Sequence, residues 1–249
     1  MRFYKYFLLS LLLMLVAQAK AQQFIGVRGS GGVSTVNFQN NINNANFFTA
    51  FTPAYSGGAF YRIYTGPHAG LQTGLDFTKK GFIQRLPASS TQDTLQAASY
   101  TYLEVPLMSS FYFFKGSTKV VLNLGPYFAY QLSNTQQLVS RSSGDIISEG
   151  PLDYDDFRDN RFDLGIRAEL GLLQSFGSNS LELTGVFSMG LKNIINPDYP
   201  SAPLGTLNMY LGIQLAYMFQ FDNARERFPF VDQRRKLARK KQKKEKRHY

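Results

Sequence analysis

The segment TLNMYLGIQLAYMFQF, residues 206–221, decides the fold. Its odd-numbered residues are all apolar or aromatic, whereas the even-numbered ones include Asn208, Gln214 and Gln220. This alternation is the pattern of a β-strand with one apolar face, and it runs far longer than the strands of about five or six residues that are common in soluble sheets. Because a tilted strand of about 9–11 residues crosses a bilayer, the segment is predicted to be a membrane-spanning strand.

Seven further segments show the same alternation or a comparable run of strand-forming residues. In one of them Leu164 and Leu170 alternate with Arg167 and Glu169. Most of the segments are long enough to cross a bilayer as tilted strands. The eight predicted strands are residues 24–35, 55–64, 68–79, 100–114, 119–132, 161–174, 180–191 and 206–221.

The connections between these segments alternate strictly between long and short. The long ones are about twenty Asn-rich residues after the first strand, then Lys80–Ser99, Ser133–Asn160 and Lys192–Gly205. The short ones are Thr65–Pro67, Lys115–Thr118 and Ser175–Asn179. Consecutive antiparallel strands reverse direction, so all long loops are expected at one end and all tight turns at the other.

An even number of long strands with segregated loop lengths is typical of outer-membrane barrels. In lipid every backbone polar group must be paired inside the protein, so the strands have to close into a ring. The predicted fold class is therefore all-β, an eight-stranded antiparallel up-and-down transmembrane β-barrel. Its long loops are expected outside the cell and both mature termini in the periplasm. A soluble lipocalin-like carrier is the alternative fold interpretation.

Charged residues fall on the strand face that would point inward. An eight-stranded barrel is only wide enough for its own side chains, so these charges are expected to pair with one another in a packed interior. A substrate or ion pathway is the alternative. The predicted interior charges are Arg28, Arg62, Asp76, Glu104, Asp163, Arg167, Glu169 and Glu182.

The formal net charge of +10 lies outside the predicted barrel. Residues 222–249 hold 12 basic and 4 acidic residues, and residues 1–21 hold three basic ones. The remaining 22–221 hold 12 basic and 13 acidic residues, so the sequence does not support a basic nucleic-acid-binding body. The absence of cysteine excludes a disulfide framework and a cysteine nucleophile.

The two charged ends define a three-part organisation. Residues 1–21 have the form of a signal peptide, because two basic residues precede the short apolar run Phe7–Ala17, and Ala19-Lys20-Ala21 follows with the small residues of a cleavage site before Gln22. That run is too short for a transmembrane helix, which needs about 20 residues. We therefore expect a signal peptide at 1–21, an outer-membrane barrel at 22–221 and a basic periplasmic tail at 222–249.

The end of the last strand and the tail suggest partners. Gly212, Leu215, Tyr217, Phe219 and Phe221 resemble the assembly signal that the barrel-insertion machinery reads. The tail is interpreted as a solvated extension, or as an electrostatic contact with anionic lipid, peptidoglycan or an acidic periplasmic protein. Nucleic acid is not expected as a partner. The basic tail residues are Arg234, Arg235, Lys236, Arg239, Lys240, Lys241, Lys243 and Lys244.

The blocks YLEVPL at 102–107 and LGPY at 124–127, with further blocks at 70–81, 164–171 and 190–194, resemble the PorT-like outer-membrane β-barrel family of Bacteroidetes-type bacteria. The resemblance covers about 24–221. It implies a small porin-family barrel without catalytic residues, and some relatives imply an accessory role in type IX secretion. Pro106 and Pro126 lie inside predicted strands and are expected to mark bulges or ladder breaks.

No catalytic, cofactor or metal site is predicted. The chain has two histidines, and His68 directly follows the Gly-Pro turn, where it is interpreted as a turn-flanking residue. The acidic cluster Asp153, Asp155, Asp156 and Asp159 is interpreted as a solvated loop, with a divalent cation as the alternative. The sequence therefore does not indicate an enzyme.

The function predicted is that of a small outer-membrane barrel with a packed polar interior. It would act as a structural or interaction protein through its long outer loops and its basic periplasmic tail. The alternatives are an accessory component of a secretion or uptake complex, or a narrow channel.

Overall fold

The computed structural model describes residues 22–39, 48–64, 68–85, 91, 93–113, 116–151, 154–155, 157–200 and 205–221. The predicted signal peptide and the basic tail from Arg234 to Lys244 lie outside the described residues. Within those ranges no helix is long and apolar enough to cross a membrane.

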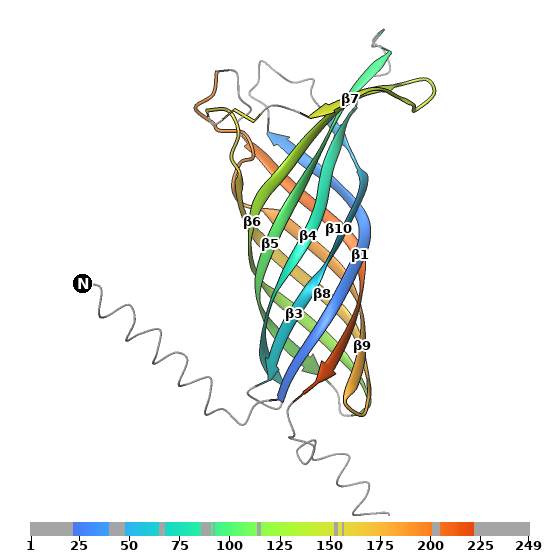
Figure 1. Cartoon of the computed structure of the whole chain (residues 1–249), viewed down its shortest axis with the longest axis vertical. Helices are drawn as coiled ribbons and strands as arrows, with labels where there is room; N and C mark the ends of the chain where they lie inside the picture. Colours follow the sequence, from blue (N-terminus) through green and yellow to red (C-terminus); the bar gives the residue numbers. More distant parts are fainter. Residues whose placement is uncertain are drawn as a thin grey trace, which may run out of the picture.

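The described residues form ten β-strands (Figure 1). They are β1 (Gln22–Gln39), β2 (Phe48–Ala50), β3 (Thr52–Tyr64), β4 (Ala69–Arg85), β5 (Thr94–Phe113), β6 (Thr118–Ser140), β7 (Ile146–Pro151), β8 (Phe162–Phe176), β9 (Asn179–Gly190) and β10 (Gly205–Gln220).

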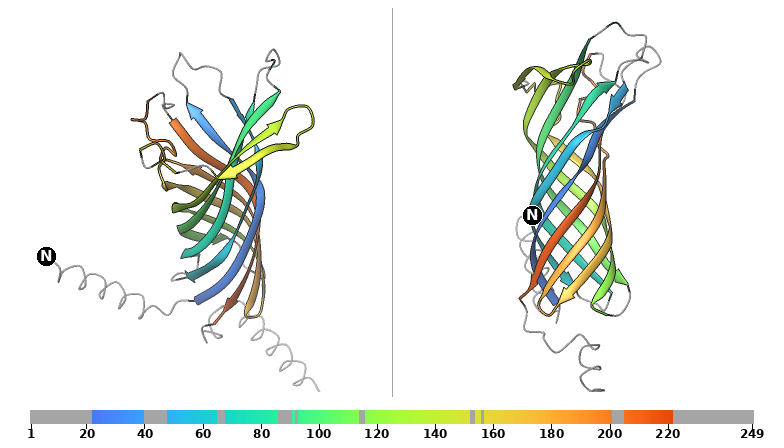
Figure 2. Two further views of the ribbon diagram at one scale, coloured as in Figure 1. Left: turned by 45° about the horizontal axis from the view of Figure 1, so that its top comes forward. Right: turned by 90° about the vertical axis from the view of Figure 1, so that its right-hand side faces the viewer.

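Eight of these strands close into an antiparallel ring. Each pairs with the next long strand along the chain, and β1 pairs with β10 to complete the circle. Gln22 lies opposite Tyr64 and Phe24 opposite Gln220, so the first and last strands begin and end beside the tight turns. The ring confirms the predicted eight-stranded up-and-down barrel, and Figure 2 shows it from two further sides.

The strands are longer at the loop end than the sequence predicts. The predicted loop Lys80–Ser99 is wrong, because β4 continues to Arg85 and β5 begins at Thr94. The predicted loop Ser133–Asn160 is also wrong, because β6 continues to Ser140 and turns back into β7. Above the lipid an outward side chain no longer has to be apolar, so the alternation that identifies a strand fades there.

These extensions build a sheet that rises beyond the ring on one side (Figure 1). It consists of the loop ends of β4, β5 and β6, with β2 paired to β4 and β7 paired to β6. We call the β6–β7 part, residues 133–151, the outer hairpin.

Pro106 and Pro126 interrupt the hydrogen-bonded ladder without shifting the register. The β4–β5 ladder skips residues 105–106, and the β5–β6 ladder skips residues 125–126. The same register resumes on the far side of each gap. Each proline is therefore a ladder break and not a bulge, as expected for a residue that lacks an N–H donor.

The outward face of the ring is a continuous apolar surface. In the middle of β10, Ile213 is 65% exposed, and apolar residues occupy the outward positions of every neighbouring strand. Such a surface is unfavourable in water and favourable in lipid. The outward apolar residues include Val27, Leu75, Phe77, Leu107, Leu124, Phe128, Ile166, Leu170, Leu183, Leu211, Ile213 and Leu215.

The lipid-facing role of the belt predicts a position-dependent cost for a charge. Ile213→Arg places a guanidinium in the middle of the belt and should destabilise the folded barrel by about 2–4 kcal/mol. Ile146→Arg is the matched control, since Ile146 is similarly exposed but lies in the outer hairpin. Urea titration of the barrel in vesicles measures both, and equal costs would contradict a lipid belt.

Candidate functional site

The space inside the ring is filled by side chains in layers. An apolar cluster lies near the tight turns, a second lies near the loops, and charged residues lie between and beside them. The first cluster is Phe24, Phe60, Tyr64, Tyr112, Val121, Leu173, Ala216 and Met218. The second is Val36, Phe82, Ala98, Tyr100, Tyr102, Tyr127, Ala129 and Ile194. The structure places all eight predicted interior charges inside the barrel as buried residues.

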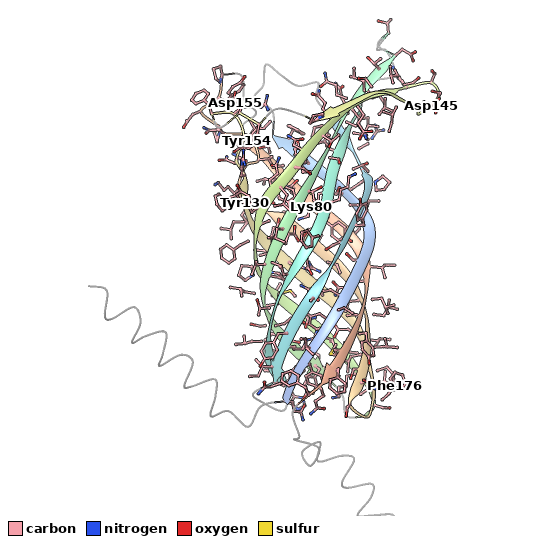
Figure 3. The ribbon with its side chains drawn as sticks, in the orientation of Figure 1. Lys80, Tyr130, Asp145, Tyr154, Asp155 and Phe176 are labelled. Atoms are coloured by element: carbon pink, nitrogen blue, oxygen red, sulfur yellow. The ribbon has the colours of Figure 1, made fainter. Side chains whose placement is uncertain are left out.

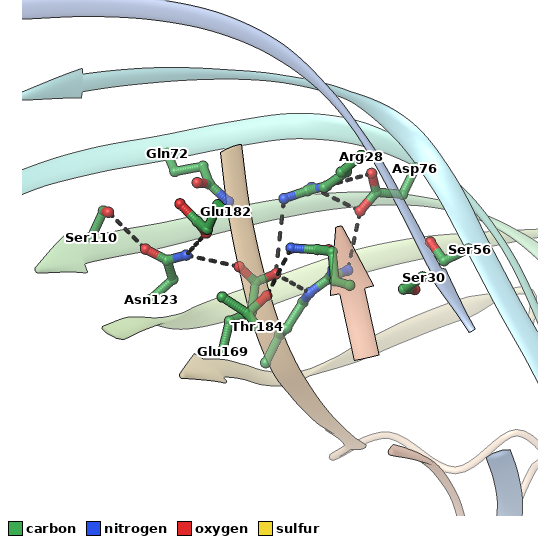
Figure 4. Close-up of polar contacts among 12 residues, drawn as sticks. Arg28, Ser30, Ser56, Gln72, Asp76, Ser110, Asn123, Glu169, Glu182 and Thr184 are labelled. Carbon is green, nitrogen blue, oxygen red and sulfur yellow. Dashed lines mark hydrogen bonds and ion pairs between the residues drawn. The ribbon is translucent and has the colours of Figure 1, made fainter. Parts of the chain in front are cut away.

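Four of the charges form a connected group in the middle of the barrel (Figure 4). Arg28 on β1 donates from Nε and Nη2 to the two oxygens of Asp76 on β4, at 2.8 and 2.7 Å. Arg167 on β8 donates from Nη1 to Asp76 at 3.1 Å and from Nε to Glu169 at 2.8 Å. The bonds to Asp76 join β4 to β1 and to β8, which are not its neighbours in the ring, so they cross-link the ring through its interior.

A second group joins β3 to β9. Arg62 donates from Nη1 and Nη2 to the Glu182 carboxylate at 2.6 and 3.1 Å, and from Nε to Gln72 at 2.7 Å. The Asn123 amide donates to Glu169 at 2.8 Å and to Glu182 at 3.2 Å. Asn123 therefore connects the two groups into one network.

The remaining predicted charges lie closer to the loops. Glu104 accepts from Lys80 Nζ at 2.5 Å, and the Lys80 ammonium lies 4.6 Å from the centre of the Tyr127 ring. Asp163 Oδ2 accepts from the Tyr127 hydroxyl at 3.2 Å and from the Asn208 amide at 3.0 Å. The group thus combines an ion pair with aromatic and amide contacts.

The sequence prediction missed two interior charges, Lys80 and Lys119. Lys80 was assigned to a loop, although it shares the even-numbered inward positions of β4 with Asp76 and Thr78, which is the signal that could have revealed it. Lys119 is buried near the tight turns, where its ammonium lies 4.4 Å from the centre of the Tyr112 ring. With both lysines, the buried interior charges among the described residues are five basic and five acidic.

The side chains inside the barrel cross-link the strands and leave no wide aqueous path among the described residues. Tyr127 shows how tightly it is packed, because the ring lies directly against Gly165, where any side chain would collide with it. Losing one partner of a buried ion pair leaves an uncompensated charge, so each member depends on the others. The arrangement can hold the ring at a fixed width.

The outer loop after β7 contains a second, smaller polar group. Arg158 pairs with Asp159, and its hydrogen bond to Asp159 raises the pKa of the guanidinium above its ordinary value. Asp155 Oδ1 accepts from the backbone N–H of Phe157 at 2.9 Å. Asp153 and Asp156 lie outside the described residues. Figure 3 shows Asp155 and Tyr154 at the loop end, opposite Phe176.

Three further expectations concern the assembly signal, His68 and a possible metal site. Leu215, Tyr217, Phe219 and Phe221 of the predicted assembly signal face outward, and Gly212 lies on the inward side against Tyr210. His68 is exposed beside the Tyr112 ring. Over the described ranges, no group of three or more His, Cys, Asp or Glu residues is arranged to hold a metal ion.

The comparison with protein families gives one match, which covers most of the barrel. The model described as "Outer membrane protein beta-barrel domain" matches residues 16–196. No curated protein matches the chain.

Several solved structures are similar to the chain at low sequence identity and with TM-scores below 0.5. The outer membrane protein OprG from Pseudomonas aeruginosa is 11% identical, with a TM-score of 0.39 over 81% of this chain and 97% of its own. Outer Membrane Protein W from E. coli is 12% identical, with a TM-score of 0.41 over 80% and 98%. Ail, the attachment invasion locus protein of Yersinia pestis, is 10% identical, with a TM-score of 0.38 over 80% and 99%.

The cross-linked interior predicts that one missing partner is worse than two. Arg62→Met leaves Glu182 buried without its base and should destabilise the barrel by about 3–5 kcal/mol. Adding Glu182→Gln should recover part of that loss, because no unpaired charge remains. Urea titration in vesicles measures both variants. Lys79→Met, on the outward side of β4, is the matched control, and an Arg62→Met variant no less stable than this control would refute the pairing.

Proposed function

The chain belongs to the outer membrane protein β-barrel domain family, and from that membership we propose that it acts as a structural and interaction protein without an open pore. This proposal rests on the observation that the polar side chains inside the ring form hydrogen bonds and ion pairs with one another. Groups used in this way are not available to a passing solute. Interaction with a partner is then left to the surfaces outside the membrane.

The outer hairpin supports this proposal. Ile146 and Ile147 on β7 are 53% and 58% exposed, and Leu138 on β6 is exposed beside them. These residues lie beyond the apolar belt, where lipid does not cover them. Apolar side chains grouped on a surface in water are typical of sites that contact another protein.

The backbone of β7 offers a second means of contact. In the part of the chain that the structure describes, β7 pairs with β6 along one edge and with no strand along the other. A free edge can accept an extended segment of another protein as an added strand. The outer hairpin thus combines main-chain donors and acceptors with two isoleucine side chains.

The basic tail supplies the contact on the opposite side of the membrane in this proposal. Each lysine or arginine near an anionic surface contributes about 1 kcal/mol, so the tail would hold anionic lipid, peptidoglycan or an acidic periplasmic protein. A two-sided contact of this kind also fits an accessory component of a secretion complex. The PorT-like subtype of the family and a role of the type IX kind are parts of this proposal.

The packed interior predicts that the protein does not conduct ions. The full chain in a planar bilayer should give no stable open current, because both ends of the interior are filled by apolar clusters. Tyr102→Ala/Tyr127→Ala, which removes two large rings from the loop-side cluster, should give measurable openings. A stable current from the unmodified protein would favour the narrow channel instead.

The two contact surfaces predict separable partner losses. Ile146→Asp/Ile147→Asp should lose cross-links to outer-surface partners, because it places charges on the exposed face of the outer hairpin. Truncation after residue 222 should lose cross-links to periplasmic components. Chemical cross-linking in whole cells, followed by identification of the linked species, measures both, and heat-modifiable migration on gels checks that the barrel is folded. Identical cross-links from both variants and the unmodified chain would overturn the proposal.

A further inference from the structure

Asp163 is the one described interior carboxylate that forms no ion pair. Asp76, Glu104, Glu169 and Glu182 each lie within 3.1 Å of a basic side chain. Among the described residues, no basic group lies within ion-pair distance of Asp163. The side chain is only 5% exposed, so water cannot easily screen its charge.

Neither of the two buried lysines forms an ion pair with Asp163. Lys80 is held by Glu104, and the Tyr127 ring that it faces donates its hydroxyl hydrogen to Asp163. Lys119 lies ten residues before Ala129, the partner of Asp163 across β6 and β8. At about 3.3 Å per residue, Lys119 is about 33 Å away along the strand. The network without Lys119 therefore carries one excess negative charge.

Three buried oxygen atoms on inward positions of β6, β8 and β10 lack a hydrogen-bond donor. Asp163 Oδ1, Asn208 Oδ1 and Gln131 Oε1 are buried and accept no hydrogen bond. The other oxygen of Asp163 binds the Asn208 amide nitrogen at 3.0 Å, which brings these two residues into contact. Buried acceptors without a donor are costly, and a cation would satisfy such oxygens and compensate the charge of Asp163 at the same time.

Two inward positions adjoin this carboxylate, one occupied by a glutamine and one by a glycine. Gln131 follows Ala129 by two residues, so it occupies the next inward position of β6, diagonal to Asp163. Gly190 on β9 lies against the carboxylate, and a side chain there would begin 3.0 Å from Asp163 Oδ1 and 3.3 Å from the Asn208 backbone nitrogen. The glycine thus keeps the space between Asp163 and Asn208 free of side-chain atoms.

We propose that Asp163 Oδ1, Asn208 Oδ1 and Gln131 Oε1 bind a monovalent alkali cation, sodium in the first instance. Carboxylate and amide oxygens are the ligands that hard cations prefer. One carboxylate and two neutral amides supply a single negative charge, which one monovalent ion neutralises. The bound ion would also tie β6, β8 and β10 together at the level of the loop-side apolar cluster.

The test compares sodium with choline, a cation that is too large to enter the proposed site. Thermal unfolding of the full chain in detergent is followed in sodium chloride and in choline chloride at equal ionic strength. Sodium should raise the unfolding midpoint in a saturable way, because it binds the folded state alone. Equal midpoints in the two salts would overturn the proposal, as would a midpoint raised by magnesium or calcium but not by sodium.

Single substitutions test which residues account for the sodium dependence of the unfolding midpoint. Asp163→Asn should abolish the sodium dependence, whereas Asp145→Asn, on an exposed turn, should leave it unchanged. Asn208→Ala and Gln131→Met keep the carboxylate but remove a ligand, and each should raise the sodium concentration at half-effect by about tenfold or more. These two variants decide the question if Asp163→Asn does not fold. Unchanged half-effect concentrations in both would overturn the assigned ligands.

Discussion

The structure depends on one constraint, the narrow space inside an eight-stranded ring. In lipid the ring must close to pair its backbone groups, and closure forces every inward side chain into a small shared volume. Most of the buried charges therefore meet a charge of opposite sign, and their order along the strands decides which pairs form. Arg28 and Arg167 both pair with Asp76, while the pair of Arg62 and Glu182 connects β3 to β9 across the interior. The pairing then fixes the ring from within.

This constraint separates the molecule into regions with different roles. The outward face contacts lipid, and the inward side chains pair with one another. Neither face is therefore available to a soluble partner. The strands that continue past the lipid are released from both demands. Their outward residues need not be apolar, and one edge, along β7, is left without a partner strand in the described chain. Exposed isoleucines on that hairpin therefore call for a different explanation from those of the belt.

Alternation predicted the ring because it reports directly on the two environments of a membrane strand. It identified eight inward charges, each of which the structure buries, including Asp76 and Glu182. It failed where the environments change. Lys80 was assigned to a loop because alternation fades at the lipid boundary, and the outer hairpin was hidden for the same reason. The individual pairs could not be predicted, since Arg62 meets Glu182 only through the register and curvature of the closed ring.

The central claim, that the interior is packed and closed to water, can be measured directly because the chain has no cysteine of its own. Single cysteines at Thr184, buried inside the ring, and at Asp145, exposed on the outer hairpin, would be exposed to a water-soluble thiol reagent in vesicles. A packed interior predicts fast labelling at position 145, and labelling at position 184 only after unfolding. Comparable rates at both positions in the folded barrel would contradict it.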